Sequence, residues 1–346
     1  MTTSERVRRW CVAWALLVVG CAGGGAEPYA LEAAGGEGGE APAAPRAEGE
    51  ASVEAEGALP AGADRRDEVH LRGEAFYPEG IAVARNGALF VGSYANGAID
   101  RVPPGGERAL PFIAPTPGTS AAGLLVDDER EALWACINDA AGVAPGVVKR
   151  YRLKTGQPDG AFPLAGGALC NDLALDAAGN LYVTESAIKT IFRLRPGGAA
   201  LEPWSVSEAF GGGAITLNGI AFDGGSNLYT VKYMTHELYR VPIGPGGAAG
   251  EPVRIEVEPP IEFPDGIKAI DATTFVVAEN DVGKVSLVKV SGDKAQKTVL
   301  ANGLAEPTTL ALVGPNVWVV EGQLSFFFGA PGSPTLPFRL RRFFLP

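Results

Sequence analysis

Four oxygen-bearing side chains occupy the same position in four similar segments, just before a short apolar run. The segments read PEGIAV, CNDLAL, LNGIAF and PDGIKA, and the residues are Glu79, Asn171, Asn218 and Asp265. Two carboxylates and two carboxamides form an all-oxygen donor set with two negative charges. Hard divalent cations take oxygen ligands, and Ca²⁺ suits this set ahead of Mg²⁺ or Mn²⁺. If the segments meet in space, they predict a divalent-cation site with positions left for water and substrate.

Turn chemistry is the alternative explanation for these four residues. Asn-Gly and Pro-Asp-Gly are common turn sequences, and the glycines of PEG, LNG and PDG supply backbone freedom. Glu79 is an unusual turn residue, however, and Asn171 is not followed by glycine. These two residues favour the cation site over the turn interpretation.

The four segments belong to a series of six repeated units. Ala122 and Thr308 hold the aligned position in the other two, and the position recurs every 43 to 49 residues. Each unit has a short apolar strand, a turn such as RNG or DAAGN, and a second strand such as NLYVTE. Four-stranded units at this period are typical of an all-β propeller, so we predict a six-bladed β-propeller with a central channel. A β-helix or two sandwiches fit the period less well.

In a propeller the first strand of each blade lines the channel, so the aligned residues should converge on one channel mouth. Residues 69–73 are expected to close the ring beside PFRLRRFF of the last unit. The second strands end on the same face and would form an outer ring of Ser93, Glu185, Lys232, Glu279 and Glu321. Glu185 and Lys232 are candidates for substrate contact, although hydrogen bonds between blades are the more common role. His236 follows soon after and could reach the mouth, or lie in a surface loop.

The apolar run SFFFGAP, residues 325–331, could cover the channel mouth. Aromatic packing between blades is the alternative role for this run.

The N-terminal residues predict export and membrane attachment. Residues 1–20 combine several arginines with an apolar run that is too short to span a bilayer, as in a secretory signal. The sequence VVGC resembles a bacterial lipobox, which implies lipidation of Cys21 and attachment to the membrane of the bacterial cell envelope. An ordinary signal peptide with an incidental Cys21 is the alternative. Residues 21–66 are rich in Gly, Ala, Glu and Pro and are expected to form a disordered linker, which leaves residues 67–346 for the propeller.

Composition and charge exclude several classes of function. The net charge of −11 argues against nucleic-acid binding. His70 and His236 are the only two histidines, which excludes a His-rich zinc site. Cys136 and Cys170 are the cysteines within the propeller region, where they could form a disulfide or remain separate buried thiols.

The motifs around Glu79, Asn171, Asn218 and Asp265 resemble those of the senescence-marker-protein/gluconolactonase/luciferin-regenerating-enzyme family of six-bladed propellers. The resemblance covers nearly all of residues 75–346. It implies that Glu79, Asn218 and Asp265 bind a divalent metal, while Asn171 completes the site or contacts substrate. The chain also departs from the family. Leu169 stands where sugar lactonases commonly carry an arginine, and the EPTT segment lacks the channel histidine of phosphotriesterase-like relatives.

These features predict a metal-dependent hydrolase that acts on a small-molecule lactone or ester at the channel mouth. The metal would polarise the reacting carbonyl, and Asp265 or Asp172 would take up the proton or attack. Asp172 could instead serve only to orient Asn171. NHL-type propellers share the general P-x-G-I-A-V pattern and are mostly binding scaffolds. A non-catalytic propeller that binds a protein or a glycan is therefore the alternative function.

Overall fold

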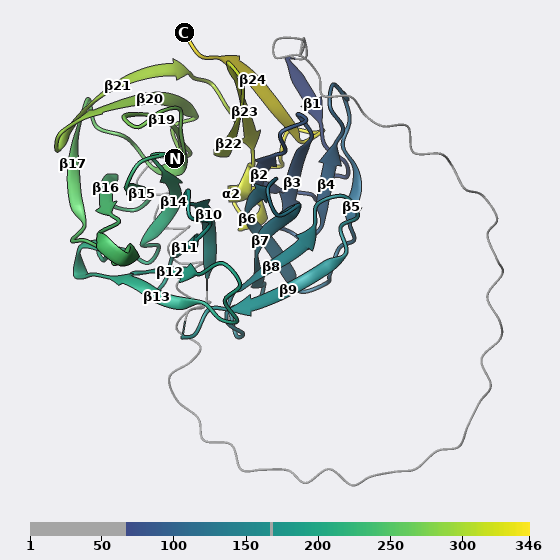
Figure 1. The fold of residues 1–346 in the computed structure, drawn as a ribbon. Helices are drawn as coiled ribbons and strands as arrows, with labels where there is room; N and C mark the ends of the chain where they lie inside the picture. Colours follow the sequence, from purple (N-terminus) through teal and green to yellow (C-terminus); the bar gives the residue numbers. More distant parts are fainter. Residues whose placement is uncertain (1–66, 167–168) are drawn as a thin grey trace, which may run out of the picture.

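The computed structural model describes residues 67–166 and 169–346. The expected signal segment, Cys21 and the whole of the expected linker lie outside the described residues. Strands dominate the described chain and surround a central axis, so the expected all-β propeller is confirmed (Figure 1). Within the described residues, no helix has the length and apolar character needed to cross a membrane.

Three of the sheets each come from four consecutive strands. The first contains β2 (Pro78–Val83), β3 (Leu89–Ser93), β4 (Ile99–Val102) and β5 (Leu110–Ile113). The second contains β6 (Thr119–Asp127), β7 (Ala132–Asp139), β8 (Val147–Arg152) and β9 (Pro158–Pro163). The third contains β10 (Cys170–Leu175), β11 (Leu181–Glu185), β12 (Thr190–Leu194) and β13 (Glu202–Val206).

The next sheet is larger, because the fourth and fifth units share it. The fourth unit supplies β14 (Leu217–Phe222), β15 (Asn227–Lys232), β16 (Glu237–Pro242) and β17 (Val253–Glu258). The fifth supplies β18 (Pro264–Ala269), β19 (Thr274–Glu279), β20 (Lys284–Ser291) and β21 (Lys294–Ala301). The outer strands β17 and β21 pair in parallel, from Glu256 with Lys294 to Glu258 with Gln296. The described strands therefore form five hydrogen-bonded sheets, which corrects the expectation of six separate blades.

The two ends of the propeller region meet in the last sheet. Strand β1 (Glu68–His70) pairs with β24 (Arg339–Phe344), which continues to β23 (Asn316–Glu321) and β22 (Pro307–Val313). Val69 of β1 is fully buried, and the Leu71 amide donates to the Phe338 carbonyl at 2.8 Å. The expected ring closure by residues 69–73 is confirmed.

Short helical turns occupy three of the connections. They are η2 (Glu208–Phe210), η3 (Pro245–Gly247) and α2 (Leu324–Phe327). Apolar side chains fill the spaces between neighbouring units, as where Phe90 and Ile99 pack with Leu133 and Ala135. This packing fixes the first strand of each unit beside the channel.

The same irregularity interrupts the first strand of every unit. In the first unit the pairing of β2 with β3 shifts between Pro78 and Ile81, and an equivalent shift recurs in the other five units. A β-bulge bends a strand and re-aims its side chains. The two residues inside each shift are the aligned residue and its successor.

The glycines after the aligned residues allow neighbouring first strands to approach closely. A Cβ atom added at Gly80 would lie 2.1 Å from the Ala122 carbonyl oxygen, and one at Gly219 would lie 2.5 Å from the Asp265 carbonyl oxygen. Neither glycine has a positive φ angle. Close packing around the axis, rather than turn chemistry, therefore explains these glycines.

Candidate functional site

The four oxygen-bearing residues line a single small cavity at one end of the channel. Strands β2, β10, β14 and β18 contribute Glu79, Asn171, Asn218 and Asp265, and the cavity volume is about 40 Å³. The other lining residues are Tyr94, Ala122, Leu169, Cys170, Ile215, Tyr233, Leu324 and Phe328. The bulged first strands therefore bring together the four residues that the sequence singled out.

Thr308 holds the aligned position in the last unit but plays a different role. Its hydroxyl group donates to the Glu79 carbonyl oxygen at 2.8 Å, and its side chain is fully buried. This hydrogen bond joins the last unit to the first beside the cavity.

The two carboxylates of the cavity are buried close to each other. Burial raises the pKa of Glu79 well above its usual value, and the negative charges of Asp265 and Asp172 raise it further. Burial also raises the pKa of Asp265, although hydrogen bonds from Asn280 and Asn218 oppose the shift. Each carboxylate is therefore in a place that disfavours its charged form unless a positive charge is present.

An unsatisfied oxygen supports a cation at this position. Glu79 Oε2 is buried and has no hydrogen-bond partner among the described residues. The Asp265 carboxylate is better supported, because Asn280 Nδ2 donates to its Oδ2 at 2.9 Å and Asn218 is also hydrogen-bonded to it. No cluster of three or more His, Cys, Asp or Glu in the described chain could hold a metal. A cation here would thus need the amide oxygens of Asn171 and Asn218 as well, and this all-oxygen set suits a hard divalent ion.

The structure places Asp172 outside this cavity. Its Oδ2 atom accepts hydrogen bonds from the Ile220 amide at 3.2 Å and from Lys268 Nζ at 3.0 Å. Among the described residues, no hydrogen bond joins its carboxylate to Asn171. In this structure the Asp172 carboxylate therefore bonds Lys268 and the Ile220 amide rather than Asn171, and its expected roles as proton acceptor or as the residue that orients Asn171 stay predictions.

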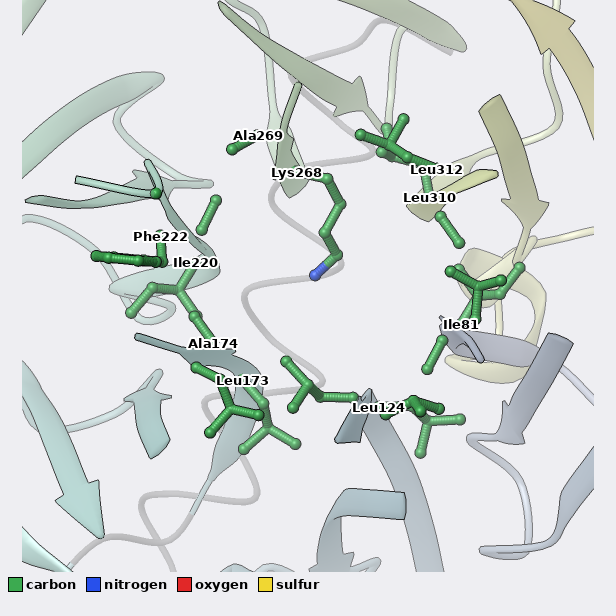
Figure 2. A pocket seen from close by; sticks show the side chains of 18 residues that line it. Ile81, Leu124, Leu173, Ala174, Ile220, Phe222, Lys268, Ala269, Leu310 and Leu312 are labelled. Atoms are coloured by element: carbon green, nitrogen blue, oxygen red, sulfur yellow. The ribbon is translucent and has the colours of Figure 1, made fainter. Parts of the chain in front are cut away.

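Lys268 is a channel residue that the sequence reasoning missed. It lines a second cavity of about 360 Å³, where it reaches into a ring of apolar side chains that includes Leu124 and Ile220 (Figure 2). Ala82, Ala174, Ala221 and Ala311 hold the equivalent lining positions in four other units. A lysine where most units carry alanine is the sequence signal that could have revealed it.

The outer ring of residues bonds within the protein instead of facing the cavity. The Glu185 carboxylate accepts from the Leu169 amide at 2.8 Å, and Lys232 Nζ contacts Glu237 at 2.7 Å. Ser93, Glu279 and Glu321 make similar internal hydrogen bonds. The alternative role of this ring, hydrogen bonding between elements, is therefore present in the structure, and substrate contact by Glu185 and Lys232 stays a prediction. His236 is half-buried against Phe263 and does not line the cavity either.

A clamp on Cys170 fixes the residue that precedes Asn171. A disulfide joins Cys136 of β7 to Cys170, which decides between the two states left open by the sequence. The Asn138 side chain donates to the Cys170 carbonyl at 2.8 Å and accepts from its amide at 2.9 Å. Nothing in the sequence pattern had indicated Asn138 as part of the site.

The segment that contains α2 forms an apolar roof over the cavity. Leu324 and Phe328 line the cavity, and we call these two residues the roof. The neighbouring Phe327 ring packs against Tyr94 and Tyr77 at centroid distances of 5.5 and 5.4 Å. Residues 325–331 thus combine the two expected roles, since the segment both covers the channel mouth and packs aromatic rings.

Comparisons with known proteins show the fold. No family model matches the chain, and no curated protein matches it. Among solved structures, a gluconolactonase from Xanthomonas campestris has a TM-score of 0.59 at 17% identity, over 81% of this chain and 89% of that one. A luciferin-regenerating enzyme has a TM-score of 0.59 at 11% identity, over 78% and 92% of the two chains. A PQQ-bound aldose sugar dehydrogenase from Streptomyces coelicolor has a TM-score of 0.56 at 17% identity, over 80% and 97%.

Proposed function

We propose that this protein is a metal-dependent hydrolase of the gluconolactonase type, acting on a lactone or an ester at the channel mouth. The observation that carries the proposal is the convergence of four oxygen-bearing side chains on one buried cavity. The fold likeness to a gluconolactonase and a luciferin-regenerating enzyme, two activities of the family that the motifs resemble, supports it. We also count the eight-stranded sheet as two blades joined at their outer strands, β17 and β21, so that the propeller has six blades.

In this proposal Glu79, Asn171, Asn218 and Asp265 would hold the metal, with Ca²⁺ the first candidate and Mg²⁺ or Mn²⁺ next. The bound metal would supply polarisation of the reacting carbonyl. As a water molecule attacks the carbonyl carbon, the Asp265 carboxylate, whose Oδ2 atom is held by Asn280, takes up a proton from that water. The C–O bond to the leaving oxygen then breaks, and Asp265 returns the proton to that oxygen. Asn171 orients the substrate through its amide, and the roof shields the site from bulk solvent while one water molecule remains as the co-substrate of hydrolysis.

The test of this function measures whether hydrolysis depends on the metal. The purified protein is incubated with a panel of lactones and aryl esters, with Ca²⁺ or with EDTA. We expect turnover that requires Ca²⁺ and is lost in Asp265→Asn. Turnover that persists in EDTA, or a panel without any turnover, would contradict the hydrolase proposal.

A non-catalytic propeller is the second candidate function, and one observation favours it. The roof covers a cavity of about 40 Å³, which is enough for an ion and a few water molecules but far below the volume of about 300 Å³ or more typical of ligand pockets. A metal held there would be structural, and the propeller would present its surface to a protein or a glycan. Stabilisation by Ca²⁺ without hydrolysis of any substrate is the outcome expected from this candidate.

Membrane attachment through Cys21 stays part of the proposal. Lipid on this residue would place the propeller on the bacterial cell envelope, at the end of the residue 21–66 linker. Expression of the full chain and of Cys21→Ser, followed by detergent partitioning and mass spectrometry, tests it. Equal partitioning of the two chains into the aqueous phase would exclude the lipid anchor.

A further inference from the structure

Apart from its four oxygen-bearing residues, the cavity has an apolar wall. Leu169, Ile215, Leu324 and Phe328 supply aliphatic and aromatic surface. No lysine, arginine or histidine of the described residues lines it. A ligand in this cavity would therefore meet hydrogen-bonding groups mainly on the side of the four oxygens.

The two tyrosines of the wall already use their hydroxyl groups. The Tyr233 hydroxyl donates to Asp281 Oδ1 at 2.9 Å, and the Tyr94 hydroxyl is hydrogen-bonded to Ser120. Burial raises the pKa of both tyrosines, so neither supplies a charge near neutral pH. The tyrosines thus present their ring faces and edges rather than polar groups.

We propose that this wall makes the site select lactones or esters with a compact apolar body over polyhydroxylated ones. The inference rests on the proposed hydrolase function and names its substrate class. A sugar lactone would bury several hydroxyl groups against side chains that offer them no partner, which is costly. An alkyl or aryl body would instead gain contact with the roof.

Phe328 is the specificity-determining side chain of this proposal. A cavity of about 40 Å³ is far smaller than the pockets of about 300 Å³ or more that enclose small ligands, so we expect part of the roof to shift when substrate binds. The start of the roof segment is held by the Gln323 amide, whose Nε2 and Oε1 bond Thr335 at 3.0 and 2.7 Å. Ser325 is held by Glu306 at 2.9 Å. Phe328 lies at the other end, where its amide donates to the Leu324 carbonyl at 3.0 Å and its ring packs against Tyr94 and Phe327. The next residue, Gly329, has a φ of 84°, a backbone conformation that glycine adopts readily.

The test compares γ-nonanolactone and phenyl acetate with glucono-δ-lactone in the presence of Ca²⁺. We expect kcat/KM to favour the two apolar substrates by at least about tenfold. Phe328→Ser should reduce this preference by about tenfold, whereas Phe328→Leu should retain most of it. Phe344→Ser, which alters an exposed ring at the far end of β24, is the matched control and should leave the preference unchanged.

Calorimetric binding of γ-nonanolactone and glucono-δ-lactone to the Ca²⁺-loaded protein separates the inference from the proposed function. If no substrate turns over but γ-nonanolactone binds more tightly, the hydrolase proposal fails and the apolar selectivity stands. If glucono-δ-lactone is bound or hydrolysed in preference, the inference is overturned. The inference is also overturned if Phe328→Ser and Phe344→Ser show the same preference for apolar substrates, because the roof then has no part in selection.

Discussion

Glu79 places a carboxyl group where the protein offers its charged form little compensation. It is 8% exposed, and one of its carboxylate oxygens meets no hydrogen-bond donor in the described chain. The nearby Asp265 adds repulsion, and burial raises the pKa of both groups. Without a cation, this pair should destabilise the fold, and with one it should become a source of stability.

A neutral replacement of Glu79 should therefore raise the stability of the fold without Ca²⁺ and lower it with Ca²⁺. We expect Glu79→Gln to raise the free energy of unfolding by about 1 kcal/mol in EDTA, because it removes buried charge repulsion. In Ca²⁺ the same variant should be less stable than the parent, because a neutral amide oxygen replaces a charged ligand and Ca²⁺ binds more weakly. Calorimetric melting in both media measures this, with exposed Glu107→Gln as the control. A shift of equal sign in both media would rule out a cation at Glu79.

Gly219 tests the close packing of the first strands. An alanine Cβ there would lie 2.5 Å from the Asp265 carbonyl oxygen, so β14 and β18 must separate. We expect Gly219→Ala to lower the free energy of unfolding by more than about 2 kcal/mol and to weaken Ca²⁺ binding. At Gly225 the nearest atom would be 3.4 Å away, and Gly225→Ala should change both quantities little. Chemical denaturation and Ca²⁺ titration distinguish the two, and equal effects would contradict this explanation.

The sequence predicted which residues meet around the axis, but not the partners of their neighbours. Glu79, Asn171, Asn218 and Asp265 could be found because the repeats place them at one aligned position. Asp172 is adjacent to Asn171, yet its carboxylate binds Lys268 of another unit, and no local pattern contains that contact. Glu185 and Lys232 were likewise placed at the correct face, but only the packed structure shows that internal partners surround them.

At the scale of elements, β7 positions β10 through the clamp on Cys170. The disulfide to Cys136 and the two hydrogen bonds of Asn138 act on the residue directly before Asn171. Three connections to one residue restrict the backbone that carries a candidate metal ligand. The sequence alone could not show this, because Asn138 and Cys170 are far apart in the chain.

Loss of the Asn138 side chain should therefore weaken metal binding. We expect Asn138→Ala to reduce Ca²⁺ affinity by about tenfold, since supporting contacts of metal ligands have effects of this size. Asn180→Ala is the matched control, because Asn180 bonds Asp176 in a turn away from the cavity. Isothermal titration with Ca²⁺ measures both variants. If they lose affinity equally, the clamp has no specific role at the site.

Glu306 holds the segment that carries the roof. Glu306 accepts hydrogen bonds from the amide and the hydroxyl of Ser325, next to Leu324. We expect Glu306→Ala to speed Ca²⁺ release by about tenfold, because the charged acceptor that holds the roof is removed. Stopped-flow release into a chelator measures the rate. Glu129→Ala, at an exposed ion pair with Arg85, is the control, and equal release rates in both would contradict a closing role of the roof.

At the scale of the whole molecule, the repeated units determine the propeller architecture. Pairing between the edge strands of the units, β17 with β21 and β1 with β24, completes it. Alternating apolar strands at a regular period were enough to predict a propeller. The parallel pairing of β17 with β21 was not predictable, because each strand shows only its own alternation and not its neighbour across a unit boundary. Closure by β1 was predictable, since an array of repeats leaves an unpaired edge that a terminal strand can cover.

Strand β1 closes the ring of sheets by pairing with β24, so a change that disrupts β1 should destabilise the closure. Val69 is fully buried and pairs with Leu340, in a cluster that includes Trp318 and Phe338. Val69→Asp should lower the free energy of unfolding by more than about 3 kcal/mol, because it buries an unpaired charge at the closure. His70→Asp adds the same group one residue later on the exposed side, and should cost less than about 1 kcal/mol.

Denaturant unfolding measures both variants, and hydrogen exchange locates the damage. In Val69→Asp the amides of β24 should exchange faster, while those of β12, across the ring, should change less. This difference follows because β24 loses its partner strand, whereas β12 keeps β11 and β13 on either side. Equal unfolding midpoints for Val69→Asp and the parent would show that the propeller holds together without β1. Uniformly faster exchange would instead show that opening of the closure and global unfolding are one event.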